Sequence, residues 1–260
     1  MNSLIQPVVL TTIVLTSLAS VTIAQVREQE TPALVTRAQR TLSNMEHLID
    51  LAAARQKSGT GQNQITVTAQ PWTDLWDGKT MDGWARTPFG GGGDVTIDPA
   101  FQGGAPAIVV KLGATLSGIN WTKTVPKTNY EISLDFMKID GNDFVCGLTF
   151  PVADSYASLI MGGWGGGVVG ISSIDNLDAS ENLTTRYMSF PPNKWFHVVM
   201  RVRPDKLEAF LNDKQIIDQE IVNRRINLRY GEIERSKPLG IATFQTSAAF
   251  RNVRLRQIGN

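Results

Sequence analysis

The stretch WTDLWDGKTMDGW, residues 72–84, places three tryptophans around two Asp-Gly pairs, just ahead of a long strand-rich tract. Asp-Gly favours tight turns, because glycine adopts positive φ without steric cost. Large aromatic side chains at the edges of such turns usually pack a loop against a β-sheet. The stretch therefore predicts the beginning of a β domain, and it shows no residues that indicate a reaction.

Downstream of this stretch, apolar residues recur with the period of a β-strand. Tyr130, Ile132, Leu134 and Phe136 alternate with polar residues, which predicts a strand with one buried face. Residues 195–203, 207–211 and 215–219 predict three antiparallel strands joined by short turns. Further strands are expected at residues 107–112, 144–152, 155–161, 168–173, 239–244 and 248–258. So many strands predict an all-β fold in which two antiparallel sheets pack together.

The first residues of the chain indicate export. Residues 4–24 form an apolar run that ends with small residues at Thr22 and Ala24, which predicts a signal peptide over residues 1–24. The chain is then periplasmic or secreted. The alternative is an inner-membrane anchor made by an uncleaved leader.

A single amphipathic helix is expected before the β domain. Apolar residues recur every three or four positions between residues 33 and 57, and a polar, glycine-bearing linker follows at residues 58–64. We therefore divide the mature chain into a helix and linker at residues 25–64 and a β domain at residues 65–260. The apolar face of the helix would need a partner, either the β domain, a second copy in a homo-oligomer or another protein.

Charge and cysteine content exclude several classes of function. The net charge is only +1, so no strong field favours nucleic acid. Cys146, the only cysteine, lies in an apolar strand without a basic neighbour, so it is expected to be a buried and inert thiol. The glycine-rich run at residues 162–167 is followed by neither Lys-Ser nor Lys-Thr, so it is not a nucleotide site.

Two motifs, LWDGKTMDGW at residues 75–84 and FRNVRL at residues 250–255, resemble the opening and closing motifs of a bacterial family. The family was first known as a domain of unknown function and is now described as 3-keto-disaccharide hydrolase or 3-keto-glucoside lyase and hydratase domains. Lys194-Trp195 and the turn at residues 211–214 match it as well. The resemblance implies a concanavalin A-like jelly-roll sandwich, export to the cell envelope and hydrolysis of oxidised disaccharides.

Candidate ligand-binding residues are Trp164, Arg186 and Gln245. Trp164 is carried on glycines, which leave its ring open for stacking on a sugar. Arg186 ends a polar loop. Gln245 matches the glutamine of the family's Gln-x-His motif, whereas Ser247 stands at the histidine position.

Candidate catalytic residues are Glu181, Asp154, Asp175 and His197. Glycosidic cleavage normally uses two carboxyl groups in different protonation states, and the loop at residues 175–186 is rich in acids. Asp154 and also Asp143 lie at strand ends. His197 could act as an acid or a base, or be a hydrogen-bonded surface residue.

No cofactor or multi-histidine metal site is expected, because the chain contains only two histidines. Calcium remains an alternative for the acidic loop, although its spacing lacks the Asp-x-Asp-x-Asp-Gly pattern.

Three functions remain open at this point. The first is an exported carbohydrate-active hydrolase that binds a sugar. The second is a non-catalytic glycan-binding module with the same fold. The third is a structural or interaction protein of the cell envelope. The first two differ in whether two acids, or an acid and His197, meet beside Trp164.

Overall fold

The central strands are built by alternation of apolar and polar residues. In the computed structural model, which describes residues 69–259, strand β6 (Tyr130–Gly141) buries Tyr130, Ile132, Leu134 and Phe136 completely. Strand β11 (Trp195–Val202) pairs with it antiparallel and buries every second residue from Phe196 to Val202. Both buried faces look into one core, as the alternation predicted.

Sheet I contains these two strands. Its order is β13-β12-β11-β6-β15-β4-β3, and β1 pairs with β15 beside this path. Its other strands are β1 (Thr73–Asp74), β3 (Val95–Asp98), β4 (Ala107–Val110), β12 (Lys206–Leu211), β13 (Lys214–Glu220) and β15 (Thr246–Gln257).

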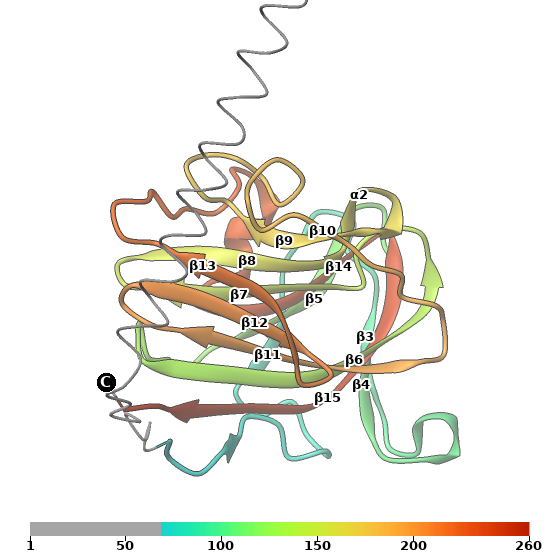
Figure 1. The fold of residues 1–260 in the computed structure, drawn as a ribbon. Coiled ribbons are helices and arrows are strands. Elements are labelled where there is room, and N and C mark those ends of the chain that lie inside the picture. Colours follow the sequence, from blue (N-terminus) through green and yellow to red (C-terminus); the bar gives the residue numbers. More distant parts are fainter. Residues whose placement is uncertain (1–68, 260) are drawn as a thin grey trace, which may run out of the picture. The chain divides into compact units, whose positions relative to one another are not determined.

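Sheet II packs against sheet I and has the order β10-β9-β8-β7-β14-β5-β2. Figure 1 shows β8 and β9 in the upper part of the molecule, with β6, β11 and β15 below them. The strands of sheet II are β2 (Trp84–Arg86), β5 (Leu116–Trp121), β7 (Cys146–Val152), β8 (Ser155–Gly162), β9 (Val168–Ser172), β10 (Arg186–Tyr187) and β14 (Leu239–Phe244). The predicted all-β sandwich of two antiparallel sheets is confirmed.

The core between the sheets is apolar and closely filled. Phe136, Phe150 and Phe250 are fully buried there, and Leu148 is almost so. Burying a phenylalanine side chain stabilises a fold by about 2 kcal/mol. Cys146 is a free, buried cysteine in this core, and desolvation raises the pKa of its thiol, so a reactive thiolate is disfavoured.

The tryptophan-rich stretch closes one edge of the sandwich. Trp76 and Trp84 are buried, and their indole N–H groups donate to the backbone carbonyls of Thr80 and Leu75. Gly83 has a φ of +76°, and a Cβ atom placed on it would lie 2.4 Å from the ring of Trp121. This position therefore requires glycine both for its backbone conformation and for the close approach of Trp121.

The two family-like motifs lie side by side. Strand β1 pairs antiparallel with β15, so that Thr73 faces Leu255 and Asp74 faces Arg254. The guanidinium of Arg256 lies 4.4 Å from the ring centre of Trp72. The first and last strands of the domain are thus neighbours.

Short connecting elements complete the fold. They are the 3-10 turns η1 (Phe101–Gly103) and η2 (Glu232–Ser236) and the four-residue turn α2 (Gly163–Gly166). Within residues 69–259, no helix has the length and apolar character needed to span a membrane. The predicted signal peptide at residues 1–24 and the helix and linker at residues 25–64 lie outside the described residues.

Candidate functional site

The outer face of sheet II, which points away from sheet I, carries a patch of polar and apolar side chains. Leu159 and Ile171 point into the core, so their neighbours Ser158, Ile160 and Ser172 point outward. Ser158 and Ser172 are direct cross-strand partners, and Thr149 is the next residue in the same row. This row forms the floor of the site.

Two segments cover this face, and the one between β13 and β14 forms a wall of the site. Ala179, in the loop after β9, lies very close to Gly170. A Cβ atom added to Gly170 would be 2.7 Å from the carbonyl oxygen of Ala179. The segment between β13 and β14 approaches Gly240 in the same way, with the carbonyl oxygen of Ser236 at 2.5 Å from such a Cβ. Glycines on the sheet surface therefore let both segments pack directly on the strands.

A pocket of about 400 Å³ lies on this face and is lined by the segment between β13 and β14, by the α2 turn and by the β6–β7 turn. Its size is at the small end of the range for ligand sites in proteins, roughly 300–1,000 Å³. Its lining residues combine an apolar wall with a few polar groups. They are Leu116, Asp143, Phe144, Ser158, Ile160, Trp164, Ser172, Arg229, Tyr230, Glu232, Ile233 and Phe244.

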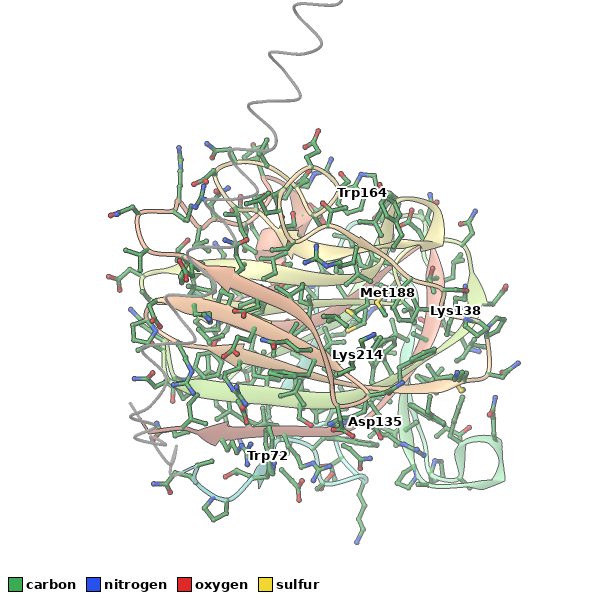
Figure 2. All side chains as sticks on the ribbon, viewed as in Figure 1. Trp72, Asp135, Lys138, Trp164, Met188 and Lys214 are labelled. Carbon is green, nitrogen blue, oxygen red and sulfur yellow. The ribbon has the colours of Figure 1, made fainter. Side chains whose placement is uncertain are left out.

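Trp164 is held at the pocket by the α2 turn. Trp164 itself has a φ of +50°, and Gly162, Gly165 and Gly166 also have positive φ. A left-handed conformation at a residue with a side chain costs about 1 kcal/mol, so the surrounding turn must enforce it. The Trp164 side chain remains 43 % exposed. Figure 2 shows it near the top of the molecule.

Two separate sets of hydrogen bonds hold the hydroxyls at the floor of the pocket. The hydroxyls of Ser158 and Thr149 lie 2.8 Å apart, and that of Ser172 donates to Oδ1 of Asp178 at 2.8 Å. Asp178 also forms an ion pair with Arg229 at 3.3 Å. Asp178 therefore links the floor to the arginine in the wall.

Two carboxylates line the pocket, and each also orders a loop. Asp143 accepts hydrogen bonds from the backbone N–H groups of Phe144 (2.7 Å) and Gly165 (3.0 Å). Glu232 accepts one from the backbone N–H of Gly90 at 2.9 Å and forms an ion pair with Arg235 at 3.2 Å. They come from different elements, the β6–β7 turn and η2.

Among the predicted ligand-binding residues, Trp164 lines the pocket. Arg186 lies on β10 opposite Val169, a core residue, and its guanidinium donates to the carbonyls of Leu183 and Thr185. Gln245 is exposed at the turn between β14 and β15, and neither it nor Arg186 belongs to the pocket lining.

The three predicted acids lie outside the pocket lining. Asp154 is exposed and pairs with Lys127 at 2.9 Å, and this pairing lowers the pKa of Asp154. Backbone and side-chain hydrogen bonds from Arg225 and Arg224 lower the pKa of Asp175. Glu181 is exposed in the loop that covers β9. These acids do not converge on Trp164.

His197 lies on the outer face of sheet I, on the other side of the sandwich from the pocket. Its Nδ1 atom is 2.7 Å from Oδ1 of Asp135, and its Nε2 atom is 3.5 Å from Oγ of Ser133. Figure 2 places Asp135 low in the molecule and Trp164 at the top. The order of groups is that of a serine-histidine-aspartate relay, but Ser133 is buried and, unlike Ser158 and Ser172, does not belong to the lining of the pocket beside Trp164.

The sequence did not point to Arg229, Tyr230 and Glu232. All three come from the segment between β13 and β14, a long stretch without strands. Connections of this length in compact domains are often functional, so loop length was an available signal.

Within residues 69–259, no group of three or more His, Cys, Asp or Glu side chains could hold a metal ion. In the acidic loop considered for calcium, Asp175 pairs with Arg224 and Asp178 with Arg229.

No curated protein matches the chain in sequence. Similar solved structures include carbohydrate binding module CBM66 from Bacillus subtilis, with 17 % identity, 66 % of this chain and 93 % of that chain covered, and a TM-score of 0.41. Another is domain 4 of AbnA, a GH43 extracellular arabinanase from Geobacillus stearothermophilus in complex with arabinotriose, with 13 % identity, 67 % and 82 % coverage and a TM-score of 0.43.

A third is a protein of unknown function with a galectin-like fold from Bacillus subtilis, with 10 % identity, 73 % and 96 % coverage and a TM-score of 0.49. The family model of 3-keto-alpha-glucoside-1,2-lyase-like domains matches residues 71–256. This match runs from just before β1 to the penultimate residue of β15.

Proposed function

Because the chain belongs to the family of 3-keto-alpha-glucoside-1,2-lyase-like domains, we propose that it is a carbohydrate-active protein whose sugar site is the pocket beside Trp164. The observation that carries this proposal is the exposed indole ring of Trp164 at the wall of a pocket with a polar floor. Sugars present C–H groups on the faces of the ring and hydroxyls around its edge. An open aromatic face and a few fixed polar groups suit both.

Several polar groups of the pocket can form hydrogen bonds with a sugar. The hydroxyls of Ser158 and Ser172 offer donors and acceptors at the floor, and the guanidinium of Arg229 offers further donors at the wall. Because Asp178 and Thr149 bond to these groups, their orientations are set before a ligand arrives. Tyr230, 94 % exposed, provides a second aromatic ring.

We further propose that the reaction is cleavage of the glycosidic bond in a 3-keto-α-glucoside. A ketone at C3 makes the C2–H bond acidic, so a carboxylate can take up the C2 proton while the C1–O bond breaks. The electron pair of the C2–H bond forms the C1=C2 double bond, and the leaving oxygen takes up a proton from water. Addition of water to that double bond would complete a net hydrolysis, the activity that the sequence resemblance implied.

Glu232 is the group that we propose for proton transfer. Both oxygens of Asp143 accept backbone N–H groups, which fixes Asp143 as a support of the α2 turn. The side chain of Glu232 is 40 % exposed, and one of its oxygens faces the exposed guanidinium of Arg235. Glu232 can therefore rearrange toward a bound sugar more easily than Asp143.

A single set of assays tests binding and turnover. The full chain is incubated with 4-nitrophenyl 3-keto-α-glucoside and with the unoxidised glucoside, and nitrophenolate release is measured. We expect nitrophenolate release from the keto form and loss of this release in Glu232→Gln. In Trp164→Ala we expect weakened binding, measured as a raised KM for release. Glu234→Gln is the matched control, because Glu234 lies in the same short helix and is 43 % exposed, but does not line the pocket. Equal losses in both glutamate variants would contradict the role of Glu232.

The second candidate is a non-catalytic sugar-binding module. It is favoured by the engagement of both pocket carboxylates with backbone N–H groups, which gives each a structural task. Sugar affinity that depends on Trp164, together with no release from either glucoside, would establish this alternative. Export to the periplasm or medium stays a prediction from residues 1–24, to be checked by cell fractionation.

A further inference from the structure

The pocket on sheet II has a polar half and an apolar half. The polar half is the floor row of Ser158 and Ser172, which continues across the sheet to Gly240 on β14. The apolar half lies further along β14, where Phe244 is about 13 Å from Gly240 at roughly 3.3 Å per residue. Phe244 lies directly opposite Leu116 of β5, and both residues line the pocket. The two ends of one pocket therefore differ in polarity.

Phe144 extends the apolar half. Its ring stacks on that of Phe244, with the ring centres 5.9 Å apart and an angle of 26° between the planes. A Cβ atom added to Gly147 on β7 would lie 3.0 Å from the ring of Phe144, so this glycine gives the ring its place on the sheet. Both phenylalanines are half-buried and line the pocket, so part of their ring surface is open to a ligand.

This half of the pocket offers few free hydrogen-bond partners. Ile233 of η2 adds a further apolar side chain to the lining. Its neighbour Glu232 and the neighbour of Phe144, Asp143, already accept backbone N–H groups. A sugar hydroxyl buried against apolar side chains loses its bonds to water without replacement, which costs about 1–3 kcal/mol for each group. A second sugar ring is therefore poorly matched to the apolar half.

An aromatic group matches it well. Such a group has no ring of hydroxyls to satisfy, and contacts between aromatic rings contribute about 0.5–1.5 kcal/mol beyond the burial of their area. The open surfaces of Phe144 and Phe244 provide these contacts, and Leu116 provides an aliphatic one. A glucose ring over the serines would leave its anomeric substituent to this half.

Cleavage of the glycosidic bond also favours an aromatic leaving group. In the reaction proposed above, Glu232 takes up the C2 proton and the leaving oxygen takes its proton from water, because Asp143 is held by two backbone N–H groups. A phenol ionises at a pH of about 10, as tyrosine does. A phenolate therefore departs without an acid more readily than a sugar alkoxide.

We propose that the apolar half of the pocket holds an aromatic aglycone, so that the ligand is an aryl glucoside rather than a disaccharide. The glucose ring lies over Ser158 and Ser172, and the aryl group lies against Phe144, Phe244 and Leu116. This inference rests on the proposed sugar site. It adds the chemical class of the group that leaves when the glycosidic bond breaks.

Titration calorimetry with the full chain tests the class of aglycone. The ligands are methyl α-glucoside, phenyl α-glucoside and maltose, which differ only in the group on the anomeric oxygen and are unoxidised, so that cleavage does not interfere. Wild-type protein is expected to bind phenyl α-glucoside about tenfold more tightly than methyl α-glucoside, which corresponds to about 1.4 kcal/mol. Maltose should bind no more tightly than methyl α-glucoside.

Variants in the two halves separate their roles. In Phe244→Ala, the ratio of phenyl to methyl α-glucoside affinity should fall from about tenfold to about twofold, because the stacking surface is lost. Phe244→Leu keeps an apolar side chain and should retain part of the ratio. Leu116→Ala truncates the cross-strand partner and should lower the ratio as well, so the result does not depend on one variant. Ser158→Ala, in the polar half, should weaken all three ligands by the same factor.

Trp164→Ala separates failure of the aglycone site from failure of the sugar site. Equal affinities of wild-type protein for the phenyl and methyl glucosides, or tighter binding of maltose than of phenyl α-glucoside, would overturn the aryl aglycone. An unchanged ratio in both Phe244→Ala and Leu116→Ala would overturn it too. In each case, weakened binding in Trp164→Ala would leave the sugar site standing. Absence of binding to any of the three ligands would overturn the proposed sugar site itself.

Discussion

The backbone N–H of Gly165 donates a 3.0 Å hydrogen bond to Oδ2 of Asp143. This bond joins the turn that carries Trp164 to the β6–β7 turn, which also lines the pocket. The other carboxylate oxygen of Asp143 accepts the N–H of Phe144, so one side chain holds two neighbouring parts of the site. Asp143 is therefore a positioning residue for Trp164.

Replacement of Asp143 should loosen the tryptophan turn without unfolding the sandwich. Asp143→Ala removes both acceptors and is expected to weaken sugar binding about tenfold, because a hydrogen bond to a charged group contributes roughly 1.5–3 kcal/mol. Asp143→Asn keeps one acceptor oxygen and should lose less. Two quantities are measured, the sugar affinity and the fluorescence emission maximum of Trp164. The emission of Trp164 is obtained by subtracting the spectrum of a reference variant that lacks this tryptophan. Identical affinities for Asp143→Ala and wild type would contradict the positioning role.

Gly83→Ala should destabilise the domain far more than a comparable change elsewhere. A side chain at Gly83 combines a φ of +76° with a contact of 2.4 Å to the Trp121 ring, so we expect a loss of about 3 kcal/mol in the free energy of unfolding. Gly103 is the matched control, since its φ is +74° and no atom lies within 4 Å of its added Cβ. Gly103→Ala should cost about 1 kcal/mol. Urea unfolding of both variants measures the difference in the free energy of unfolding. Equal losses in the two variants would show that the contact with Trp121 does not destabilise the fold.

Glu131→Gln should be strongly destabilising while sparing sugar binding. Glu131 is 1 % exposed, and its two oxygens lie 2.6 Å from the Nε atoms of Arg201 and Arg256. Removing one member of a buried charged group costs about 3 kcal/mol, because the partners are left without compensation. The group lies on sheet I, away from the pocket, so sugar affinity of the folded variant should match wild type. A loss of stability below about 1 kcal/mol, the value for an exposed pair, would contradict this expectation.

Asp135→Asn should change how stability responds to acid. Burial by itself raises the pKa of Asp135, but hydrogen bonds from His197 and Asn252 outweigh it, so the pKa lies below its ordinary value of 3.8. A depressed pKa means that the carboxylate stabilises the fold above the ordinary value and loses this contribution as pH falls through the folded-state pKa.

The free energy of unfolding of Asp135→Asn should therefore lie below that of wild type at pH 7 and converge with it below about pH 4. Urea titrations across this range check the convergence. Asp213→Asn, at an exposed turn, controls for the loss of one negative charge. A constant gap between Asp135→Asn and wild type at all pH values would refute the linkage.

The strands that alternate in sequence were predictable, and those built by tertiary context were not. Strand β14 has the predicted bounds of residues 239–244, and β6 buries the predicted residues, because period-two patterning is a local property. Strand β10 has only two residues, and β5 is interrupted by Gly118, so neither shows a clear period. Both are strands because their neighbours in sheet II supply hydrogen-bond partners.

The site was predictable only where one residue had an unusual local setting. Trp164 was identified from its flanking glycines, which produce the turn that the structure shows. Glu232 and Arg229 reach the pocket because a segment distant in sequence folds over β5 and β14, which no local pattern encodes. The predicted acids Asp154, Asp175 and Glu181 are ordinary loop carboxylates, and composition alone could not show which side of the sandwich they face.

The pairing of β1 with β15 also sets how the domain bears mechanical load. Residues 69 and 258 form a bridge at the same end of these antiparallel strands, and Thr73 and Leu255 follow it inward. A force that separates residues 69 and 259 loads the hydrogen bonds one after another, as in a zipper, rather than all at once. The edge marked by the two family motifs is therefore the place where tension would first open the sandwich, while the pocket on sheet II stays outside the line of force.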